Sequence, residues 1–405
     1  MLSDVYFPRI NGVSTSLATF RRSLQRLGHR VTLVVPAYPG HGAMCGPEAD
    51  DPDLIRIPSR YVVLDPEDRI LKGRQIGPHL RRRRIDSADV IHIHTPFVAH
   101  YAGVRLARRW QVPVVETYHT FFEEYLQHYL PWLPAPWLRA FARRVSRSQC
   151  NAVDHVIAPS TALCRVLRGY GIESPVTRLP TGIDPARWAG GDGERFRARY
   201  NIEPERELLV HVSRIAHEKN IGFLLEMLRH LCRQRPDVLL LIAGEGPAKA
   251  SLQRHAARLG LQANVLWCGY LDRTTTLLDC YRAGDVFVFA SATETQGLVL
   301  LEAMATGLPV VSTARLGTTD ILTAKSGARV SPEEPAVFAD HVACVLADPG
   351  TRQSMRDQQR RWVQQWTDTR MAKALMALYA NGTGVPVPAG PPRPTDAYGR
   401  TTPRE

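Results

Sequence analysis

Short apolar runs alternate with amphipathic helical segments along almost the whole chain. The runs are rich in Val, Leu and Ile and mostly lack the alternation of apolar and polar residues that marks a strand with one solvated face. This pattern is typical of parallel strands covered on both sides. The runs occupy residues 31–36, 90–95, 114–118, 155–159, 208–213, 238–243, 265–269, 286–290 and 309–313, and helices are indicated at 16–27, 223–233 and 249–259. The alternation therefore predicts an α/β fold of doubly wound parallel sheets with right-handed crossovers.

A chain of 405 residues is too long for a single hydrophobic core, so more than one domain is expected. Residues 181–207 are rich in Gly, Pro and charge and carry no strand pattern, which indicates a boundary. We expect a first domain at 1–185, a linker at 186–206, a second domain at 207–350, helices at 351–380 and a disordered Pro- and Gly-rich tail at 381–405. Two such domains would face each other across a cleft at the carboxyl ends of their strands, where doubly wound sheets bind ligands.

The positive charge is concentrated in the first half. Residues 1–187 hold 25 Lys and Arg against 16 Asp and Glu, a net +9, and the remainder holds 26 against 23, a net +3. This asymmetry favours an anionic partner such as a membrane surface, a nucleic acid or a charged substrate. Arginines form a run at 81–84 and recur at helical spacing among aromatic and apolar residues, in the set Arg139, Arg143, Arg144, Arg147, Trp132, Trp137, Leu138 and Phe141. A basic helix with flanking aromatics can lie on an anionic leaflet, although a solvated helix face with ordinary core aromatics would give the same pattern.

The sequence lacks membrane-spanning and targeting segments and several common cofactor and metal motifs. No apolar run approaches the roughly 20 residues that span a bilayer, and the start lacks a signal-peptide pattern. The seven cysteines have neither metal-ligand nor redox spacing. Glycine-rich dinucleotide and Walker-type motifs are absent, and so are HExxH and paired-Asp metal loops. We therefore expect no metal or cofactor, and a location in the cytoplasm or at the inner face of the membrane.

The strongest candidate site runs from Glu294 to Glu302, between a buried strand and a helix that stops at Gly307. Gln296, Gly297 and Leu298 would present free N–H groups at the helix N-terminus, which suit phosphate or hydroxyl oxygens. The two carboxylates accept hydrogen bonds only and could hold two sugar rings of one extended ligand. Alternatively, Glu294 caps the helix and Glu302 is a solvated helix residue.

Three further segments follow expected strands. Arg214 and Lys219 bracket a loop before a helix, and two cations beside a helix N-terminus favour a diphosphate site, although surface charges would look the same. Asn11-Gly12 precedes a helix, where glycine lets the backbone approach a ligand, although an ordinary turn capped by Ser14 or Ser16 is the alternative. His119 ends a buried strand where ligands are expected, but a lone histidine is more often structural.

Taken together, these segments resemble the retaining glycosyltransferases of family 4, whose GT-B architecture has two doubly wound Rossmann-like domains facing each other across a cleft. The resemblance covers nearly all of residues 3–380, in the family's order, and rests on DVYFPRINGVSTS, HIHTPF, TYHT, APS, LPTGID, VSRIAHEKN, IAGEGP and ASATETQGLVLLEAMATGLPVV. Thr295-Gln296-Gly297 replaces the Ser-Phe-Gly of many members. This variant is similar to the branch with diacylglycerol glucosyltransferases and related glycolipid and mannosyl enzymes. The short start, with only Met1 and Leu2 before Ser3-Asp4, departs from the family's first strand.

The resemblance implies a role for each candidate residue. Arg214 and Lys219 would neutralise the leaving diphosphate, which would also receive backbone N–H groups from Asn11-Gly12. The donor sugar would meet Glu294 and His119. The remaining contacts to the donor would come from Glu302 at the ribose, from the amides of Gln296, Gly297 and Leu298 at the sugar, and from Gly269, Tyr270 and Leu271 beside the base.

The implied activity is transfer of a hexose from a UDP- or GDP-sugar to a hydroxyl acceptor with retention of configuration and without a metal. A membrane lipid or glycolipid is the expected acceptor. No pair of close carboxylates supplies a nucleophile of the kind used by retaining glycosidases, which favours attack on the same face as the leaving group. A nucleotide-sugar epimerase of the same architecture is one alternative. The other is a basic nucleic-acid-binding protein, which would need stacking aromatics or a binding module that the chain lacks.

Overall fold

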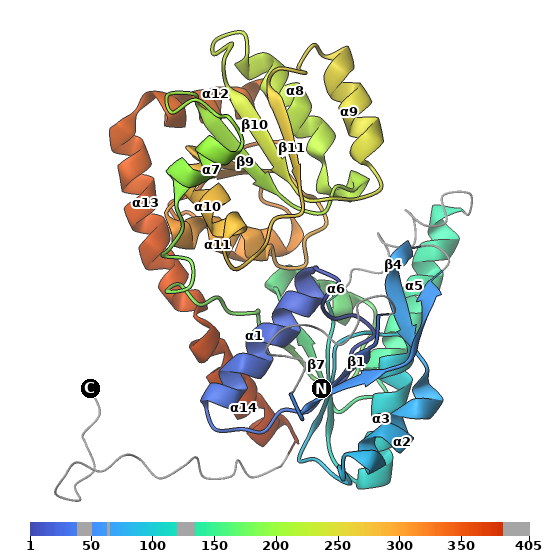
Figure 1. The fold of residues 1–405 in the computed structure, drawn as a ribbon. Coiled ribbons are helices and arrows are strands. Elements are labelled where there is room, and N and C mark those ends of the chain that lie inside the picture. Colours follow the sequence, from blue (N-terminus) through green and yellow to red (C-terminus); the bar gives the residue numbers. More distant parts are fainter. Residues whose placement is uncertain (39–50, 63–64, 120–133, 384–405) are drawn as a thin grey trace, which may run out of the picture.

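The computed structural model describes residues 1–38, 51–62, 65–119 and 134–383, leaving aside the side chains at 62, 65–68 and 381–383. Two α/β halves lie one above the other and are joined by two crossing segments of the chain (Figure 1). The sequence-based prediction of two doubly wound α/β halves with parallel sheets is confirmed.

The first half is built on short parallel strands. One pair joins β1 to β2, and a four-stranded sheet has the order β5-β6-β7-β8. Leu2 forms isolated parallel bridges to both Val34 and Ile93, so it connects the pair to the sheet as a one-residue strand. The parallel strands are β1 (Leu33–Pro36), β2 (Leu54–Ile57), β5 (Ile91–Ile93), β6 (Val114–Thr117), β7 (His155–Ala158) and β8 (Val176–Arg178), and an antiparallel hairpin pairs β3 (Ser59–Val62) with β4 (Asp65–Leu71).

Helices cover both faces of this sheet. They are α1 (Gly12–Arg26), α2 (Ile76–Arg82) with the short η1 (Gly73–Gln75), α3 (Val98–Trp110), α5 (Ala135–Cys150) and α6 (Thr161–Gly169). The expected start of the first helix at residue 16 is wrong by four residues. Asn11 is its N-cap, because the Asn11 side chain accepts a hydrogen bond from the Ser14 N–H at 2.9 Å.

The second half contains one six-stranded parallel sheet, with the order β11-β10-β9-β12-β13-β14. Its strands are β9 (Leu208–Val212), β10 (Leu239–Ala243), β11 (Val265–Gly269), β12 (Val286–Phe289), β13 (Val310–Ser312) and β14 (Arg329–Val330). Side chains from β9, β10 and β12 enter a separate hydrophobic core on each face. One core is closed by α8 (Ile221–Leu231), α9 (Lys249–Arg258) and α12 (Pro335–Ala347), and the other by α7 (Gly193–Arg199), α10 (Thr276–Ala283) and α11 (Leu298–Thr306).

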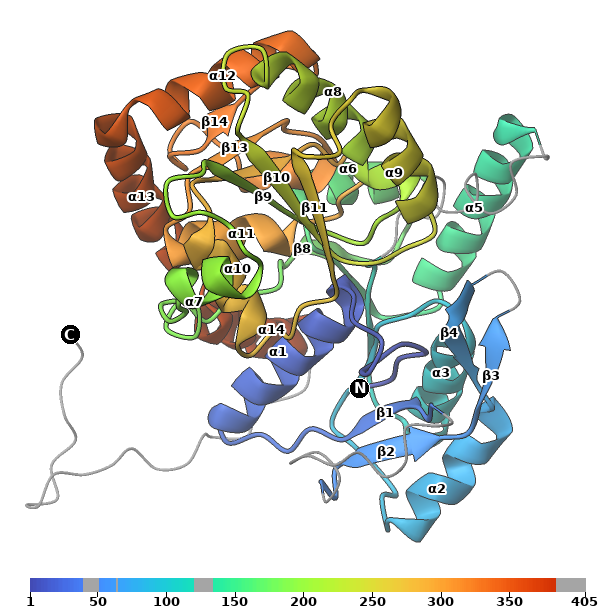
Figure 2. The ribbon, with the colours of Figure 1, turned by 45° about the horizontal axis from the view of Figure 1, so that its top comes forward.

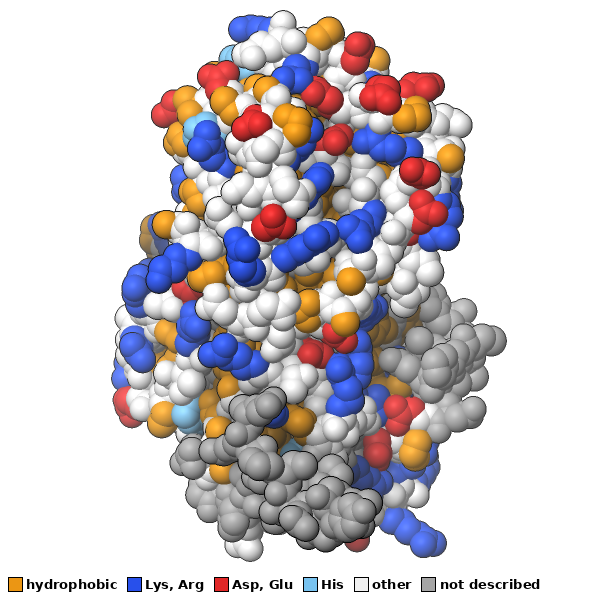
Figure 3. All heavy atoms as spheres, turned by 90° about the vertical axis from the view of Figure 1, so that its left-hand side faces the viewer, with side chains coloured by type: hydrophobic (Ala, Val, Ile, Leu, Met, Phe, Trp, Pro, Cys, Tyr) orange, Lys and Arg blue, Asp and Glu red, His pale blue; other side chains and the backbone are white. Residues whose placement is uncertain are grey.

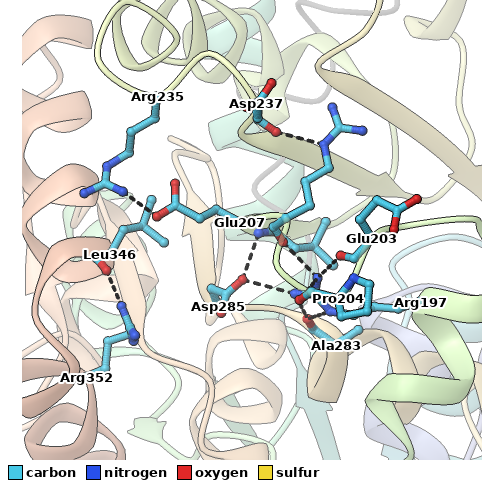
Figure 4. A network of polar contacts seen from close by, with 12 residues as sticks. Arg197, Glu203, Pro204, Glu207, Arg235, Asp237, Ala283, Asp285, Leu346 and Arg352 are labelled. Atoms are coloured by element: carbon cyan, nitrogen blue, oxygen red, sulfur yellow. Dashed lines mark hydrogen bonds and ion pairs between the residues drawn. The ribbon is translucent and has the colours of Figure 1, made fainter.

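The segment between the halves folds onto the second half. Arg197 of α7 donates to the carbonyl oxygens of Glu203 and Arg206 at 3.0 and 2.8 Å, and to that of Ala283. It also contacts the carboxylate of Asp285, which accepts the Leu208 N–H at the start of β9 (Figure 4). One guanidinium therefore ties the incoming chain to the sheet.

The chain returns to the first half through its last helices. The helix α13 (Pro349–Val363) packs against α11, and after η4 (Gln364–Trp366) the helix α14 (Asp368–Thr383) lies along α1 (Figures 1 and 2). The two crossing segments run side by side, because the Ile183 N–H donates to Trp366 O and the Asp368 N–H donates to Ile183 O, both at 2.8 Å. Lys and Arg side chains gather around the middle of the face that carries these helices (Figure 3).

Among the helices of the described ranges, none is both long enough and apolar enough to cross a bilayer.

Candidate active site

The carboxyl-end loops of β9 and β10 pack against each other closely enough to exclude any side chain at Gly244. A Cβ on Gly244 would lie 1.9 Å from the carbonyl oxygen of Ser213, and its φ of +142° is a conformation that other residues rarely adopt. This contact fixes the loop that carries Arg214, which lies half-buried two residues beyond β9.

Lys219 and Glu294 lie together although 75 residues separate them. Lys219 ends the short η2 (His217–Lys219) after β9, and Glu294 follows β12, the neighbouring strand of the sheet. Lys219 Nζ is 2.6 Å from Glu294 Oε1, and both side chains are about one-fifth exposed, at 19% and 18%. An ammonium has three N–H donors, so this ion pair leaves donors available to a ligand.

The loop from Glu294 to Gly297 is held by η3 (Leu316–Asp320). The Gly317 N–H donates to the Glu294 carbonyl oxygen at 2.8 Å, and a Cβ on Gly317 would lie 2.0 Å from the carbonyl oxygen of Thr295. Gly297 is the N-cap of α11 in a left-handed conformation, so its own amide and that of Leu298 lie at the helix N-terminus. The helix ends at Gly307, as the sequence predicted.

Thr295 and Gln296 bridge the two halves, a role that the sequence analysis missed. The Gln296 side chain accepts from the Thr181 N–H and donates to the Thr181 carbonyl oxygen, both at 2.8 Å. Thr295 Oγ1 donates to the carbonyl oxygen of His119 at 3.0 Å. No local sequence signal could have indicated these contacts, since their partners lie more than 100 residues away.

Glu302 is buried at 3% exposure, so the alternative of a solvated helix residue is wrong. Its carboxylate forms an ion pair with Arg273 and accepts a hydrogen bond from the Tyr281 hydroxyl at 3.0 Å. Burial and the Glu302 charge raise the pKa of Tyr281 well above its ordinary value, which keeps the hydroxyl protonated as a donor. Burial alone would lower the pKa of Arg273, but the charge of Glu302 and the Tyr281 hydroxyl raise it overall. The Arg273 guanidinium also lies 5.6 Å from the centroid of the Trp188 ring. Sequence reasoning did not identify Arg273 or Tyr281.

A cavity of about 340 Å³ lies between the halves, in front of Glu302. Ile10 and Thr15 line it from the first half, and Arg273 and Leu298 line it from the second. A Cβ on Gly12 would meet no atom within 4 Å, so the start of α1 borders open space. Glu302 lines this cavity, whereas Gly12 begins α1 in the first half and is not among the lining residues.

His119 follows β6 and is half-buried. Its Nε2 atom is 3.0 Å from Nδ1 of His94. Burial lowers the pKa of His119 to about 4, so its imidazole is neutral at pH 7.

The residues expected beside the base occupy the end of β11. Gly269 is the last strand residue, and its carbonyl oxygen accepts the Gly244 N–H at 2.7 Å. Tyr270 is 47% exposed, whereas Leu271 belongs to the core under this edge of the sheet. Tyr270 is therefore partly accessible to a ligand at this edge of the sheet. In the described ranges, His, Cys, Asp and Glu side chains form no group able to hold a metal ion.

The protein has two doubly wound halves that face each other, and the candidate residues Arg214, Lys219 and Glu294 follow strands of the second sheet at their carboxyl ends. Together with the family match reported next, this arrangement defines a glycosyltransferase of the GT-B class. The chain belongs to glycosyltransferase family 4: the family described as Glycosyltransferase Family 4 matches residues 10–187, and that described as Glycosyl transferases group 1 matches residues 192–362.

Known proteins of this kind are similar over most of the chain. An alpha-monoglucosyldiacylglycerol synthase of Streptococcus pneumoniae is 31% identical, over 77% of this chain and 70% of that protein. A protein of the same name from Acholeplasma laidlawii is 27% identical, over 77% and 79%. Anabaena HepE, solved with UDP-glucose, superposes with a TM-score of 0.75 at 17% identity, over 94% of this chain and 98% of that one. Neither the epimerase nor the nucleic-acid-binding alternative is supported by these relatives.

Proposed function

We propose that this chain transfers a hexose from a UDP-sugar to a hydroxyl group of a membrane lipid, with retention of configuration. The name of the Streptococcus pneumoniae relative supports a lipid acceptor, and the HepE complex supports a UDP-linked donor. The observation that carries the proposal is the ion pair of Lys219 and Glu294, which joins a candidate phosphate ligand to a candidate sugar ligand.

The leaving diphosphate gains negative charge as its bond to the sugar breaks, and stabilising this charge is the main task of the site. Arg214 and Lys219 approach from the second half, and the Asn11-Gly12 backbone approaches from the first. Glu294 orients the Lys219 ammonium, whose other N–H groups remain for a phosphate oxygen. Each fixed donor of this kind is worth about 3 kcal/mol of transition-state stabilisation.

Glu302 is proposed to bind the ribose hydroxyls. A carboxylate has about four lone-pair positions, and Arg273 and Tyr281 each use one. The other positions remain for the two hydroxyls of a ribose. The amides of Gln296, Gly297 and Leu298 and the Tyr270 ring would contact the sugar and the base, respectively.

The transfer step exchanges one bond at the anomeric carbon for another. The acceptor oxygen bonds to that carbon as the bond to the diphosphate oxygen breaks, and the acceptor proton moves to the departing phosphate oxygen. The proposal gives Glu294, whose Oε1 atom pairs with Lys219, a binding role at the donor sugar rather than the role of a nucleophile. Attack on the face that the diphosphate leaves retains the configuration, and closure of the two halves would exclude water.

A membrane-facing surface is proposed on α5. Trp137 and Phe141, one helical turn apart, are 77% and 59% exposed, while Leu138 faces the core rather than the arginines around it. Arg139, Arg144 and Arg147 are exposed on the same helix, which stands at the edge of the first half (Figure 2). The arginines at 81–84 are exposed too, and Trp132 lies outside the described residues. Exposed aromatics flanked by arginines suit an anionic leaflet.

The function is tested by supplying UDP- and GDP-hexoses to the protein with lipid vesicles and identifying glycosylated lipids by mass spectrometry. The variant Arg214→Ala/Lys219→Ala should lose more than about a hundredfold in rate. Arg233→Ala/Lys325→Ala, which removes two exposed cations elsewhere in the second half, is the matched control. A rate within tenfold of wild type in the first variant would show that the diphosphate assignment is wrong.

A further inference from the structure

Three imidazole rings lie in a row beneath the candidate active site. The ring centroids of His92 and His94 are 4.0 Å apart, and those of His94 and His119 are 5.3 Å apart with nearly parallel planes. His92 is anchored at both nitrogens, with Nδ1 at 2.7 Å from the Tyr379 hydroxyl and Nε2 at 2.7 Å from Thr117 Oγ1. The row therefore rests on α14 and β6 at one end and reaches His119 at the other.

His94 is almost completely buried, at 1% exposure. Its Nδ1 atom is 3.0 Å from His119 Nε2, and its Nε2 atom is buried without a hydrogen-bond partner in the described part of the chain. Burial lowers the pKa of both histidines, so neither ring carries the second proton near neutral pH. In the hydrogen bond between two neutral imidazoles, one nitrogen donates and the other accepts.

The buried Nε2 atom of His94 distinguishes the two possible arrangements. If His119 donated from Nε2, His94 would accept at Nδ1 and would carry its own proton on Nε2. That Nε2–H would be a buried donor with no acceptor. If His94 instead donates from Nδ1, its Nε2 atom is unprotonated and is a buried acceptor that receives no hydrogen bond. Buried N–H groups without a partner are rarer in proteins than acceptors without one, which favours donation by His94.

We propose that His94 is a positioning residue that donates its Nδ1–H to His119 Nε2 and thereby holds His119 in the tautomer protonated on Nδ1. Given the proposed function, His119 then offers the donor sugar an N–H rather than a lone pair, and the sugar oxygen accepts. The hydrogen bond from Thr295 Oγ1 to the His119 carbonyl oxygen holds this residue beside Glu294 across the seam. In the described residues, the Nδ1 atom of His119 makes no hydrogen bond, so it is available to the ligand.

A matched pair of substitutions tests the role of His94. In His94→Asn, the side-chain amide places an N–H where Nδ1–H was, whereas His94→Leu keeps the bulk and removes the donor. With a UDP-hexose as donor, kcat should stay within about threefold of wild type for His94→Asn and fall at least about tenfold for His94→Leu. The affinity for UDP should be unchanged in both variants, because UDP lacks the sugar that His119 contacts. Equal kcat values for the two variants would overturn the proposal.

The tautomer itself is measurable without any activity. Long-range proton–nitrogen correlation spectra of protein labelled with ¹⁵N at histidine distinguish Nδ1–H from Nε2–H rings, and a His119→Asn sample assigns the signal. We expect His119 protonated on Nδ1 in wild type and His94→Asn, and a mixture of tautomers in His94→Leu. A His119 ring protonated on Nε2 in wild type would refute the proposal. Absence of hexose transfer with all donors would instead count against the proposed function, and the spectra would still decide the tautomer.

Discussion

The Gln296 side chain accepts a hydrogen bond from the Thr181 N–H and donates one to the Thr181 carbonyl oxygen. This pair of hydrogen bonds, here called the clamp, joins the two halves. Both residues are buried, and Thr181 Oγ1 also contacts Ser16 Oγ of α1 at 2.6 Å. Gln296 thus holds the second half against the first.

Replacing Gln296 by Leu should weaken this seam. The change leaves the Thr181 N–H and carbonyl buried without partners, at a cost of about 2–4 kcal/mol for the two groups together. We expect a lower midpoint of urea unfolding and reduced kcat/KM. Gln353→Leu is the control, since Gln353 is exposed and its side chain donates to Asp357 on the same helix, and it should change stability by less than about 0.5 kcal/mol. Equal effects of the two substitutions would contradict the clamp.

Lys219 and Glu294 should behave as one unit in a double-substitution cycle. Lys219→Met should weaken UDP binding by removing a cation from the diphosphate, and Glu294→Gln should weaken it less, through the loss of orientation of Lys219. The coupling between the two changes should be about 0.5–3 kcal/mol, as for residues in direct contact. Calorimetric titration with UDP measures all three variants. Strict additivity would show that the ion pair is not maintained in the complex.

Glu302 should account for discrimination between ribose and deoxyribose. Wild type should bind UDP more tightly than 2′-deoxy-UDP, because a missing hydroxyl leaves a carboxylate oxygen without its donor. Glu302→Gln should lose most of this preference. Tyr281→Phe, which removes one orienting hydrogen bond, should lose part of it. Competition binding with the two nucleotides gives the ratio for each variant, and an unchanged ratio in Glu302→Gln would exclude the ribose role.

Acid should destabilise the fold below about pH 6.5. Burial lowers the pKa of His119 and His211 to about 4 and those of His92 and His94 well below 6.5. The unfolded histidines bind protons from about pH 6.5 downward while the folded ones do not, so stability falls as pH drops through this window, by up to about 1.4 kcal/mol per pH unit for each group.

Asp4 acts in the opposite direction, because burial raises its pKa to about 6 and its folded carboxyl binds a proton first. Four histidines outweigh this single carboxyl. Thermal unfolding should therefore occur at a lower temperature near pH 5.5 than near pH 7.5, and His94→Asn should reduce the difference. Equal unfolding temperatures at the two pH values would contradict burial of neutral histidines.

Vesicle binding should depend on α5. Sedimentation with vesicles containing anionic lipid should recover the wild-type protein at low salt and less of it at high salt. Trp137→Ser/Phe141→Ser should reduce binding by about tenfold, since two exposed aromatic anchors are removed. Val330→Ser, which changes an exposed apolar residue of β14 in the second half, is the control and should bind as wild type does. Salt-insensitive binding, or none, would remove the membrane surface from the proposed function.

Much of the fold could be predicted from local patterns. The nine expected strands all coincide with observed strands to within one or two residues at each end, because a run buried on both faces leaves a continuous apolar signature. Of the strands that were missed, β2, β3, β8 and β14 have at most four residues each, and β8 and β14 are exposed at sheet edges, where burial imposes little pattern. The seven-residue β4, with the sequence DPEDRIL, is rich in charged residues and lacks the apolar run that marked the other strands. Leu2 acts as a strand only because Val34 and Ile93 flank it.

The sequence by itself determined where the strands and helices lie and which residues stand at or near their ends. Apolar runs, capping residues and glycines are local signals that involve only a few neighbouring positions. It therefore identified Arg214, Lys219, Glu294, Glu302 and His119 as candidates. Only the tertiary structure decided which of them meet. Lys219 pairs with Glu294, Arg273 and Tyr281 hold Glu302, and His94 contacts His119 because parallel crossovers bring distant strand ends to one edge. Such contacts depend on the packing of whole layers, which no short stretch of sequence encodes.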